Sequence, residues 1–374
     1  MRCSIPISVF ALLTIVLSAC RPVTAPPTPT APSEAAVASP TAAPDASITI
    51  LDALGRTVIL PSLPQRIVLT GRALFMIADA AYIFPGAGER IVGMGSTAQG
   101  SGNFIKLIDP DYASKQTLER DAGAEQVAAL QPDLVMMKSN LAETVGAPIE
   151  ALGIPVVYID FETPEQYGRD LAILGKVFGD EARAAEIAAF YQNRVEAISA
   201  AVQDAPRPRT LLLYYNDRDG NVAFNVPPME WIQTRMVAIA GGEPVWADAN
   251  PGKGWTQVTL EQIAAWDADK IFIVSYLKDP VEVVEGLRTD PNWSAVRAVK
   301  KGHLYPFAFD LYSWDQPDPR WILGLTWLAG KLHPDRFPTL DMLAEAQTFY
   351  QKLYGLDEAF VNENIAPTFS GVLP

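Results

Sequence analysis

The amino-acid sequence predicts an α/β protein with two lobes, each built on a mostly parallel sheet, and one long helical segment that joins them. Short apolar runs alternate with helical patterns along most of the chain, which is typical of parallel strands connected by helices. Residues 163–202 interrupt this alternation, because their apolar side chains recur at helical spacing throughout. A short pattern also occurs twice, once on either side of the interruption. Together these observations favour two Rossmann-like lobes joined by one long helical segment.

The start of the chain predicts export rather than folded structure. An apolar run, residues 5–17, ends at the sequence LSAC, whose last residue is Cys20; this closely resembles the lipobox of bacterial lipoproteins. In an ordinary secretory signal Cys20 would have no role. We expect residues 1–20 to be a lipoprotein signal peptide with the lipid on Cys20. Residues 21–46, rich in Pro, Ala and Thr, predict a disordered tether.

Composition excludes several classes of function. Cys3 and Cys20 are the only cysteines, so the domain after the tether has neither a disulfide nor thiol chemistry. The net charge of -14 argues against nucleic-acid binding, which needs clustered Lys and Arg. No later segment reaches about 18 uncharged apolar residues, so we expect no further membrane span. Residues 47–374 provide enough chain for one large or two medium domains.

Residues 47–162 predict the N-terminal lobe. Alternating patterns at residues 48–51 and 57–60 flank Leu54-Gly55-Arg56 and predict a β-hairpin. The other strands are expected at residues 66–70, 91–94, 134–137 and 155–159, and helices at residues 73–83 and 124–130.

Residues 163–204 predict the connecting helix, and residues 205–374 the C-terminal lobe with terminal helices. Thr163 is expected at the N-cap, with Gln166 completing a capping box, and a break is expected near Gly179-Asp180. In the second lobe we expect strands at residues 210–215 and 303–307, a helix-turn-strand unit at 260–274, and helices at 229–240, 319–332 and 340–354.

The repeated pattern reads AEQVAALQPDLVMM at residues 124–137 and LEQIAAWDADKIFI at residues 260–273. Thr259 and Gln262 predict a capping box at the start of the second copy. Glu125 and Glu261 therefore lie in the first turns of equivalent helices, where a carboxylate is stabilised by about 0.3–1 kcal/mol. Either this stabilisation or a contact with a two-subunit partner accounts for the two glutamates.

Several motifs occur in a characteristic order along the chain. They are DALGRTVILPSLPQRIVLTG, GAEQVAALQPDLVMM, GIPVVYID, GWTQVTLEQIAAWDADKIFIV and AVKKGHLYPF. Their order and spacing resemble the periplasmic-binding-protein family for iron complexes and cobalamin, the helix-linked class of solute-binding proteins of ABC importers. The closing segment SWDQPDPRWILGLTWLAGKLHPDRF resembles the C-terminal helix of a subset that includes molybdate and tungstate binders.

The resemblance implies two lobes with the ligand in the cleft between them. It also implies a monomeric binding protein, not an enzyme, that is lipid-anchored to the outer face of the cytoplasmic membrane. It implies capture of an iron-siderophore-type metal chelate and its delivery to a permease dimer with its ATPase. Cobalamin, haem, molybdate and tungstate are the alternative ligands. By motif, Glu125 and Glu261 match the glutamates that pair with arginines of the two permease subunits in the family.

Ligands of α/β lobes bind beyond the carboxyl ends of strands, so the loops at those ends supply the candidate residues. Arg72 and Lys138 can neutralise an anionic chelate, and aromatic side chains can stack on its flat parts, although such aromatics also suit core positions. The candidate ligand-binding residues are Arg72, Ser96, Lys138, Tyr215, Asn216, Trp255, Tyr276, Tyr312, Trp314 and Asp315.

The sequence offers no recognisable site for a bare metal ion. His303 and His333 are the only histidines, and a buried or capping role accounts for both. There is no CxxC or HExxH spacing. We therefore expect no cofactor, and a metal that arrives inside its own chelate or oxyanion.

An anchored extracellular hydrolase is the main alternative. Asp310 and Asp315 supply two carboxylates such as glycosidases use, but the sequence does not fix their separation. Residues 93–98 fit the G-x-G-x-x-A dinucleotide pattern, yet glycine and polar residues follow where a helix should begin. There is no G-x-S-x-G or Walker A sequence. These features favour a binding protein over an enzyme.

Overall fold

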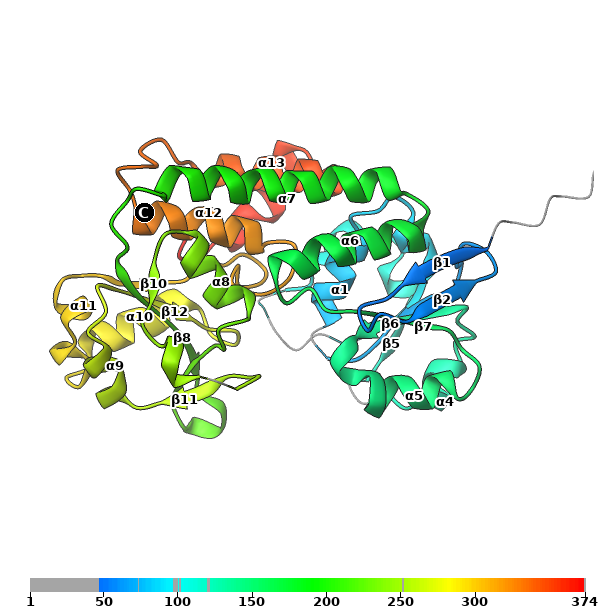
Figure 1. Ribbon diagram of the computed structural model, residues 1–374, viewed down its shortest axis with the longest axis horizontal. Coiled ribbons are helices and arrows are strands. Elements are labelled where there is room, and N and C mark those ends of the chain that lie inside the picture. Colours follow the sequence, from blue (N-terminus) through cyan, green and yellow to red (C-terminus); the bar gives the residue numbers. More distant parts are fainter. Residues whose placement is uncertain are drawn as a thin grey trace, which may run out of the picture. The chain divides into compact units, whose positions relative to one another are not determined.

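The computed structural model describes residues 47–372, apart from residues 73, 97–99, 101, 120–121 and 251. The predicted signal peptide, Cys20 and the tether lie outside the described residues. The described chain contains two separate sheets of the α/β type and a two-stranded hairpin, and helices surround the sheets (Figure 1). The predicted fold class is confirmed.

The N-terminal sheet has five parallel strands in the order β5-β4-β3-β6-β7. They are β3 (Ile67–Leu69), β4 (Ile91–Gly95), β5 (Gln116–Leu118), β6 (Leu134–Lys138) and β7 (Val156–Ile159). From β3 the chain continues to β4 and then to β5 at one edge of the sheet. It then returns to β6, which pairs with the other side of β3. This reversal is a topological switch point, beyond which α/β proteins bind their ligands. The sequence analysis missed β5, because only one of its side chains is buried.

Both faces of this sheet are covered. Leu134 and Met136 of β6 belong to the large hydrophobic core, whereas Val135 and Met137 point to a second cluster on the opposite face. A continuous apolar strand buried on both sides is typical of parallel sheets. We call this sheet and the helices packed on it the N-terminal lobe.

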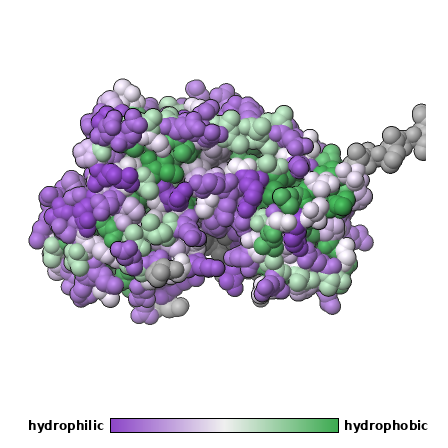
Figure 2. Space-filling view, in the orientation of Figure 1, coloured by the Kyte–Doolittle hydropathy of each residue, from purple (hydrophilic) through white to green (hydrophobic). Residues whose placement is uncertain are grey.

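The predicted hairpin is confirmed as β1 (Ile48–Leu51) paired with β2 (Thr57–Leu60). Its outward face carries Leu51 and Ile59, which are 63% and 64% exposed. Elsewhere the face of the molecule in Figure 2 is mainly hydrophilic, with apolar side chains in separate patches. A mostly hydrophilic exterior agrees with the acidic composition.

The connecting segment forms two helices, α6 (Pro164–Phe178) and α7 (Glu181–Val202), with the break where it was expected. Gly179 ends α6 with a φ of 74° and Asp180 caps α7 by accepting from the Arg183 N–H, so α7 turns back along α6. Only α7 continues to the second lobe (Figure 1). The Gln166 side chain accepts from the N–H of Glu162 and not of Thr163, so the predicted capping box is only half formed.

The C-terminal sheet has the order β11-β9-β8-β12-β13, and the short β10 pairs with the start of β8. Its strands are β8 (Arg209–Asn216), β9 (Ala223–Val226), β10 (Glu243–Pro244), β11 (Thr256–Val258), β12 (Lys270–Val274) and β13 (Leu304–Pro306). Strands β8, β12 and β13 are parallel, and β9 and β11 add antiparallel partners. The sequence analysis missed β9 and β11, whose side chains are mostly half-buried or exposed. This sheet and its helices form the C-terminal lobe.

Helices fill the connections between strands. In the N-terminal lobe they are α1 (Leu74–Ala81), α2 (Ala87–Arg90), α3 (Phe104–Ile108), α4 (Ala124–Ala128) and α5 (Ala147–Glu150). In the second half of the chain they are α8 (Ile232–Ile239), α9 (Leu260–Trp266), α10 (Pro280–Thr289), α11 (Arg297–Lys300), α12 (Trp321–Leu332), α13 (Met342–Tyr354) and α14 (Glu358–Asn364).

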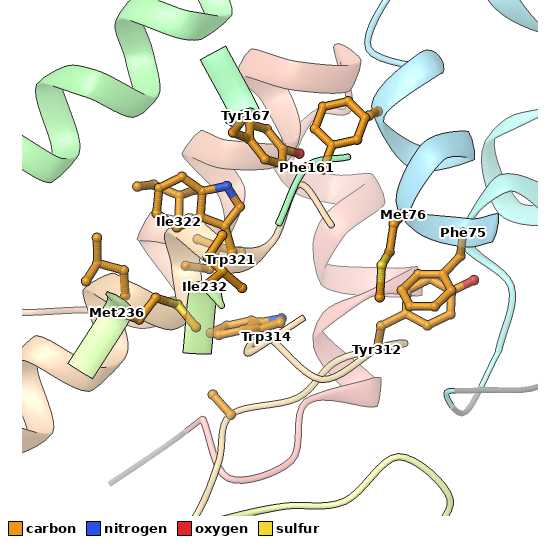
Figure 3. Packing of buried hydrophobic residues seen from close by; sticks show 14 of the residues in the cluster. Phe75, Met76, Phe161, Tyr167, Ile232, Met236, Tyr312, Trp314, Trp321 and Ile322 are labelled. Atoms are coloured by element: carbon orange, nitrogen blue, oxygen red, sulfur yellow. The ribbon is translucent and has the colours of Figure 1, made fainter. Parts of the chain in front are cut away.

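The chain between β13 and α12 is unusually well buried for a connection. Every residue from 307 to 320 is buried, although the segment contains no helix or strand. Its Tyr312 ring stacks on that of Phe75 of α1 (Figure 3), and its Asp315 carboxylate accepts a hydrogen bond from Gln233 of α8. This segment therefore lies inside the molecule, between elements of the two lobes.

Candidate functional site

Three adjacent strands of the N-terminal sheet end with candidate residues from the sequence. Arg72 follows β3, Ser96 follows β4, and Lys138 is the last residue of β6, so β4, β3 and β6 bring the three residues to one edge of the sheet. Arg72 and Ser96 are exposed, whereas Lys138 is buried. The topological switch point thus carries one exposed cationic side chain and one exposed hydroxyl.

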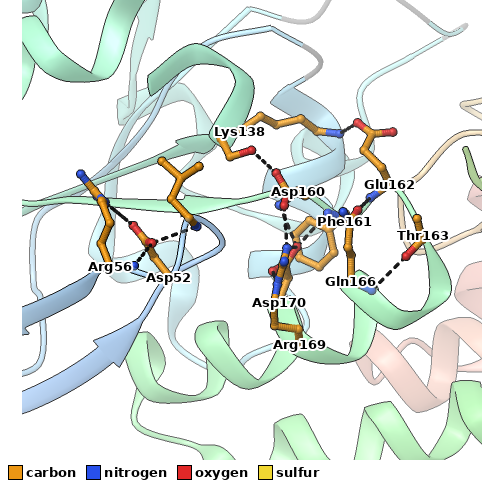
Figure 4. Close-up of polar contacts among 12 residues, drawn as sticks. Asp52, Arg56, Lys138, Asp160, Phe161, Glu162, Thr163, Gln166, Arg169 and Asp170 are labelled. Carbon is orange, nitrogen blue, oxygen red and sulfur yellow. Dashed lines mark hydrogen bonds and ion pairs between the residues drawn. The ribbon is translucent and has the colours of Figure 1, made fainter. Parts of the chain in front are cut away.

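The Lys138 ammonium already has a charged partner. It is bound to the carboxylate of Glu162, which follows β7 (Figure 4). Its charge is therefore largely compensated before any ligand arrives. Beside it, the Ser139 hydroxyl donates to Asp160, whose other oxygen accepts from Arg169 at 2.7 Å.

A strained backbone position lies next to these charges. Phe161 has a φ of 60°, a conformation that non-glycine residues rarely adopt. The Asp170 carboxylate on α6 holds it by accepting from the backbone N–H groups of Asp160 and Phe161, at 2.7 and 2.8 Å (Figure 4). Burial raises the pKa of Asp170, and hydrogen bonds from Arg169 and these N–H groups oppose that rise. Strain of this kind is concentrated at functional sites.

The C-terminal lobe contributes an aromatic cluster, which we define as Tyr214, Trp231, Trp255 and Tyr276. Tyr214 lies near the end of β8, and Tyr276 follows β12. The ring centroids of Tyr214 lie 4.6 Å from Tyr276 and 5.1 Å from Trp255, and Trp231 lies 5.7 Å from Trp255. Both tryptophans are half-buried, so part of the cluster faces solvent. The cluster supplies flat apolar surface at the carboxyl ends of the central strands.

A buried polar centre lies beneath the aromatic cluster. Tyr276 donates its hydroxyl to Asp315 Oδ2 at 2.7 Å, and Gln233 Nε2 donates to the same oxygen at 3.3 Å. Burial raises the pKa of Asp315 to about 6, although the hydrogen bonds from Tyr276 and Gln233 favour the ionised form. Asp315 Oδ1 has no hydrogen-bond partner within the described part of the chain.

Several predicted residues occupy other positions. Tyr215 faces the opposite side of the sheet from Tyr214, where its ring lies 5.8 Å from that of Phe224. Asn216 accepts a hydrogen bond from the N–H of Arg218, closing the loop after β8. The structure therefore does not bring Tyr215 or Asn216 into the aromatic cluster.

Tyr312 and Trp314 are fully buried in the segment between the lobes. The Tyr312 ring stacks on Phe75 of α1 with centroids 4.5 Å apart, and its hydroxyl accepts from the N–H of Phe104 at 3.3 Å. Tyr312 thus joins the lobes in this structure and exposes no surface to a cleft. Asp310 is also fully buried; it binds Arg320 and Tyr350, whereas Asp315 binds Tyr276. The two carboxylates thus belong to separate hydrogen-bonded groups.

Sequence reasoning missed Tyr214, Trp231 and Gln233. Tyr214 could have been found from the alternation along β8, because adjacent residues of a strand face opposite sides of the sheet. Trp231 and Gln233 stand at the start of α8 and do not follow a predicted strand, so the strand-end rule gave no signal for them.

A cavity of about 330 Å³ lies beside the aromatic cluster. Its lining includes Tyr276, Lys278 and Phe309, together with Gly100 from the N-terminal lobe. The Gly100 N–H donates to the Tyr276 carbonyl at 3.3 Å, so residues from both lobes meet there. Larger cavities of about 870 and 730 Å³ lie beside the hairpin and beside α12, not at the carboxyl ends of strands. Topology and residue chemistry therefore favour the smaller cavity and its surroundings as the candidate site.

The two copies of the repeated pattern form equivalent helix starts in different lobes. Glu125 and Glu261 are exposed in the first turns of α4 and α9. The Thr259–Gln262 capping box is confirmed, whereas Gly123 has no side chain, so only Gln126 caps there, by accepting from the Gly123 N–H. Helix N–H groups and the Thr259 hydroxyl lower the pKa of Glu261. Figure 1 places α4 and α9 along the same side, away from α7.

The described residues contain neither a membrane-spanning helix nor a metal-binding group of side chains. None of their helices combines the length and apolar character needed to cross a membrane. In the same residues, no three His, Cys, Asp or Glu side chains are grouped so as to hold a metal ion.

One lobe on a parallel sheet and one on a mixed sheet, a connecting helix, and polar and aromatic residues at the strand ends define a solute-binding architecture. A family model described as periplasmic binding protein matches residues 98–310, more than half of the chain. The molybdate-binding protein MolA of Haemophilus influenzae is 26% identical, over 82% of this chain and 90% of its own. A cobalamin-binding protein of Halobacterium salinarum is 26% identical, over 82% of this chain and 78% of its own. A periplasmic solute-binding protein from Veillonella parvula has the same fold, with a TM-score of 0.68, 23% identity and coverage of 86% of this chain and 100% of its own.

The chain belongs to the periplasmic binding protein family. The resemblance inferred from the sequence motifs is thereby confirmed. The protein is an extracytoplasmic solute-binding component of an ABC transporter, and it acts with the permease of that transporter. The family consists of proteins that bind solutes for transport.

Proposed function

We propose that the protein captures a metal ion enclosed in an organic shell, of the iron-siderophore type, and delivers it to the permease dimer of an ABC importer. The observation that carries this proposal is the aromatic cluster of Tyr214, Trp231, Trp255 and Tyr276. The half-buried rings of Trp231 and Trp255 offer apolar surface, and the buried rings of Tyr214 and Tyr276 support it, which suits the organic part of a chelate. A small inorganic anion would use little of that surface.

The charges around the strand ends are compatible with such a ligand. Arg72 is an exposed cation at the switch point, which suits the negative charge common among metal chelates. Asp315 and Gln233 offer hydrogen-bonding groups beneath the rings, where they can fix the orientation of a bound molecule. Cobalamin and haem also combine a metal with a large organic ring, and the cobalamin-binding relative supports including them.

A molybdate or tungstate anion is the second candidate. The relative MolA binds molybdate and resembles this chain over most of both lengths. Trp314 Nε1 and Gln316 Nε2 are buried N–H donors without a hydrogen-bond partner among the described residues, and an oxyanion accepts from such donors. This candidate requires the lobes to separate, because both residues are buried.

A thermal-shift screen separates these candidates. The protein is heated with ferric siderophores, haem, cobalamin, molybdate and tungstate in turn. A ligand at 100 times its Kd adds about 2.7 kcal/mol to the free energy of unfolding, which gives a clear rise in Tm. We expect a ferric siderophore to raise Tm and molybdate to leave it unchanged. A rise in Tm with molybdate and none with a ferric siderophore would favour the oxyanion as the ligand. No shift with any compound would reject both candidates.

We also propose that a lipid on Cys20 anchors the protein and that residues 21–46 tether it to the outer face of the membrane. The LSAC sequence and the Pro, Ala and Thr composition support this proposal. Replacing Cys20 by Ser should move the exported protein from the membrane fraction to the soluble fraction. Retention of the Cys20→Ser protein in the membrane fraction would show that another feature anchors it.

A further inference from the structure

One arginine lies at the point where the two lobes meet. Arg320, just before α12, is fully buried. Its Nη1 donates to Asp79 Oδ2 at 2.6 Å, and its Nε donates to Asp310 Oδ2 at 3.1 Å. Asp318 Oδ2 lies 3.3 Å from Nη1. We call Arg320 and the carboxylates of Asp79, Asp310 and Asp318 the arginine cluster.

The arginine cluster connects the lobes directly. Asp79 belongs to α1, which contacts β3 and β4 of the N-terminal sheet. Arg320 leads into α12, which contacts α8, and α8 in turn contacts β8 of the C-terminal sheet. A second pair, Glu165 with Arg235, also joins α6 to α8, but both side chains are largely exposed and such pairs contribute little. The buried arginine cluster therefore holds the lobes together more strongly than the exposed Glu165–Arg235 pair does.

Aromatic rings from both lobes enclose the guanidinium. Phe104 of α3 and Tyr312 of the buried segment lie 4.7 and 5.0 Å from its central carbon (Figure 3 shows Tyr312 against Phe75 of α1). The Tyr354 hydroxyl on α13 also donates to the Asp79 carbonyl at 3.0 Å. The contact is thus a packed interface that excludes water, where charge interactions are strong and unpaired charges are costly.

The arginine cluster contains more acid than base. Three carboxylates contact one guanidinium, so within the described part of the chain they compete for a single positive charge in the interior. Asp79 Oδ1 also has no hydrogen-bond partner among the residues described by the structure. Protonation of a buried carboxylate removes its negative charge, and this costs less free energy than burying the charge without a partner. Burial accordingly raises the pKa of Asp79 to about 6, against the opposing attraction of Arg320, and raises the pKa of Asp318 well above its usual range.

Apart from the carboxylates of the arginine cluster, the ionisable side chains that face it within the described residues are tyrosines, and burial raises the pKa of each. They are Tyr82, Tyr167, Tyr191, Tyr312, Tyr350 and Tyr354. Asp79 and Asp318 are therefore the members of the arginine cluster whose protonated forms burial favours.

We propose that the arginine cluster is a proton-dependent latch, which holds the two lobes together more firmly in mildly acidic surroundings and loosens as the pH rises. When the lobes separate, Asp79 meets water and recovers an ordinary pKa, whereas in the closed form it binds a proton more tightly. Linkage then requires that protonation favours closure. For pKa values of about 6 closed and 3.8 open, the ratio of closed to open molecules is about tenfold higher at pH 5 than at pH 8. The latch does not depend on which ligand the cleft holds.

The distance between the lobes, measured by pulsed electron paramagnetic resonance on the ligand-free protein, tests the latch. Cys3 and Cys20 are replaced by Ser, and spin labels are placed on cysteines introduced at the exposed positions Leu152 and Glu285, one on each lobe. We expect the closed population to grow relative to the open population by about tenfold between pH 8 and pH 5. A ratio that stays constant or falls toward pH 5 would overturn the proposal.

Asp79→Asn tests the contribution of Asp79, because the amide imitates the protonated carboxyl. This variant should stay mainly closed at both pH values and lose most of the pH dependence. Asp111→Asn, at an exposed carboxylate outside the arginine cluster, is the matched control and should behave like the parent protein. A pH dependence in Asp79→Asn equal to that of the parent would place the titrating group elsewhere and overturn the latch. If Asp79→Asn does not fold, the ratio of closed to open molecules of the parent protein at pH 5 and pH 8 still tests the latch.

Discussion

Tyr214 and Tyr215 are consecutive residues of β8 and face opposite sides of the C-terminal sheet. The Tyr214 ring lies 4.6 Å from Tyr276 and 5.1 Å from Trp255, whereas the Tyr215 ring lies 5.8 Å from Phe224. Phe224 in turn lies 4.8 Å from Trp293 on that other side. Chemically identical side chains one residue apart therefore belong to different parts of the molecule, and they form a matched pair for mutation.

Tyr214→Ala should weaken ligand binding, and Tyr215→Ala should not. An aromatic contact contributes about 0.5–1.5 kcal/mol beyond its buried area, so we expect Kd to rise about tenfold in Tyr214→Ala. Isothermal titration calorimetry with the compound that stabilises the protein in the thermal-shift screen measures the change. Equal losses of affinity in both variants would mean that Tyr215 also contacts the ligand, as the sequence analysis expected.

The repeated glutamates should affect transport and not ligand capture. Glu125→Lys and Glu261→Lys each reverse an exposed charge at a helix start, and the two helices belong to different lobes. We expect the double variant to lower uptake in cells while Kd stays unchanged, because neither residue lies at the candidate site. Glu285→Lys, at an exposed position on α10, is the control and should leave uptake intact. A lower ligand affinity in the double variant would instead assign the glutamates to the binding site.

The strands most easily predicted from the sequence were those with unbroken apolar runs. β6 and β12 each carry such a run after a capped helix, so periodicity and capping agreed on their positions. The Arg72, Ser96 and Lys138 positions followed, because the carboxyl ends of neighbouring parallel strands meet at one edge. Local rules were sufficient for these residues.

The aromatic cluster and the buried segment were predictable only in part. Trp255 and Tyr276 were candidate residues from the sequence, whereas Tyr214 and Trp231 were not. The four rings come from different parts of the chain and meet only through tertiary packing. Asp310 and Asp315 are typical of an exposed loop, yet hydrogen bonds from Arg320 and Tyr276 permit their burial. Local sequence patterns do not predict that Arg320 and Tyr276 will bind these two aspartates.

The turn between α6 and α7 gives a prediction about stability. Gly179 has a φ of 74°, and an added Cβ would lie 2.9 Å from the Leu63 side chain. Because L residues are strained in this conformation by roughly 1–2 kcal/mol, Gly179→Ala should lower the free energy of unfolding by about that amount. Gly168→Ala, within α6 where an added Cβ meets nothing within 4 Å, should raise it by about 0.5–1 kcal/mol. Denaturant unfolding measures both, and a loss of stability in Gly168→Ala would contradict the helical assignment there.

Asp315 should make the protein less stable as the pH rises. Its pKa is raised from 3.8 to about 6 by burial, so between these values the folded protein holds a proton that the unfolded chain has lost. Stability therefore falls with rising pH across this window, by at most about 3 kcal/mol at 1.36 kcal/mol per pH unit. Asp315→Asn cannot titrate and keeps an acceptor for the Tyr276 hydroxyl. The free energy of unfolding, measured from about pH 4 to pH 7, should thus decline more steeply in the parent than in Asp315→Asn. Parallel curves for the two proteins would mean that Asp315 is ionised at an ordinary pKa and that its burial is compensated by its hydrogen bonds alone.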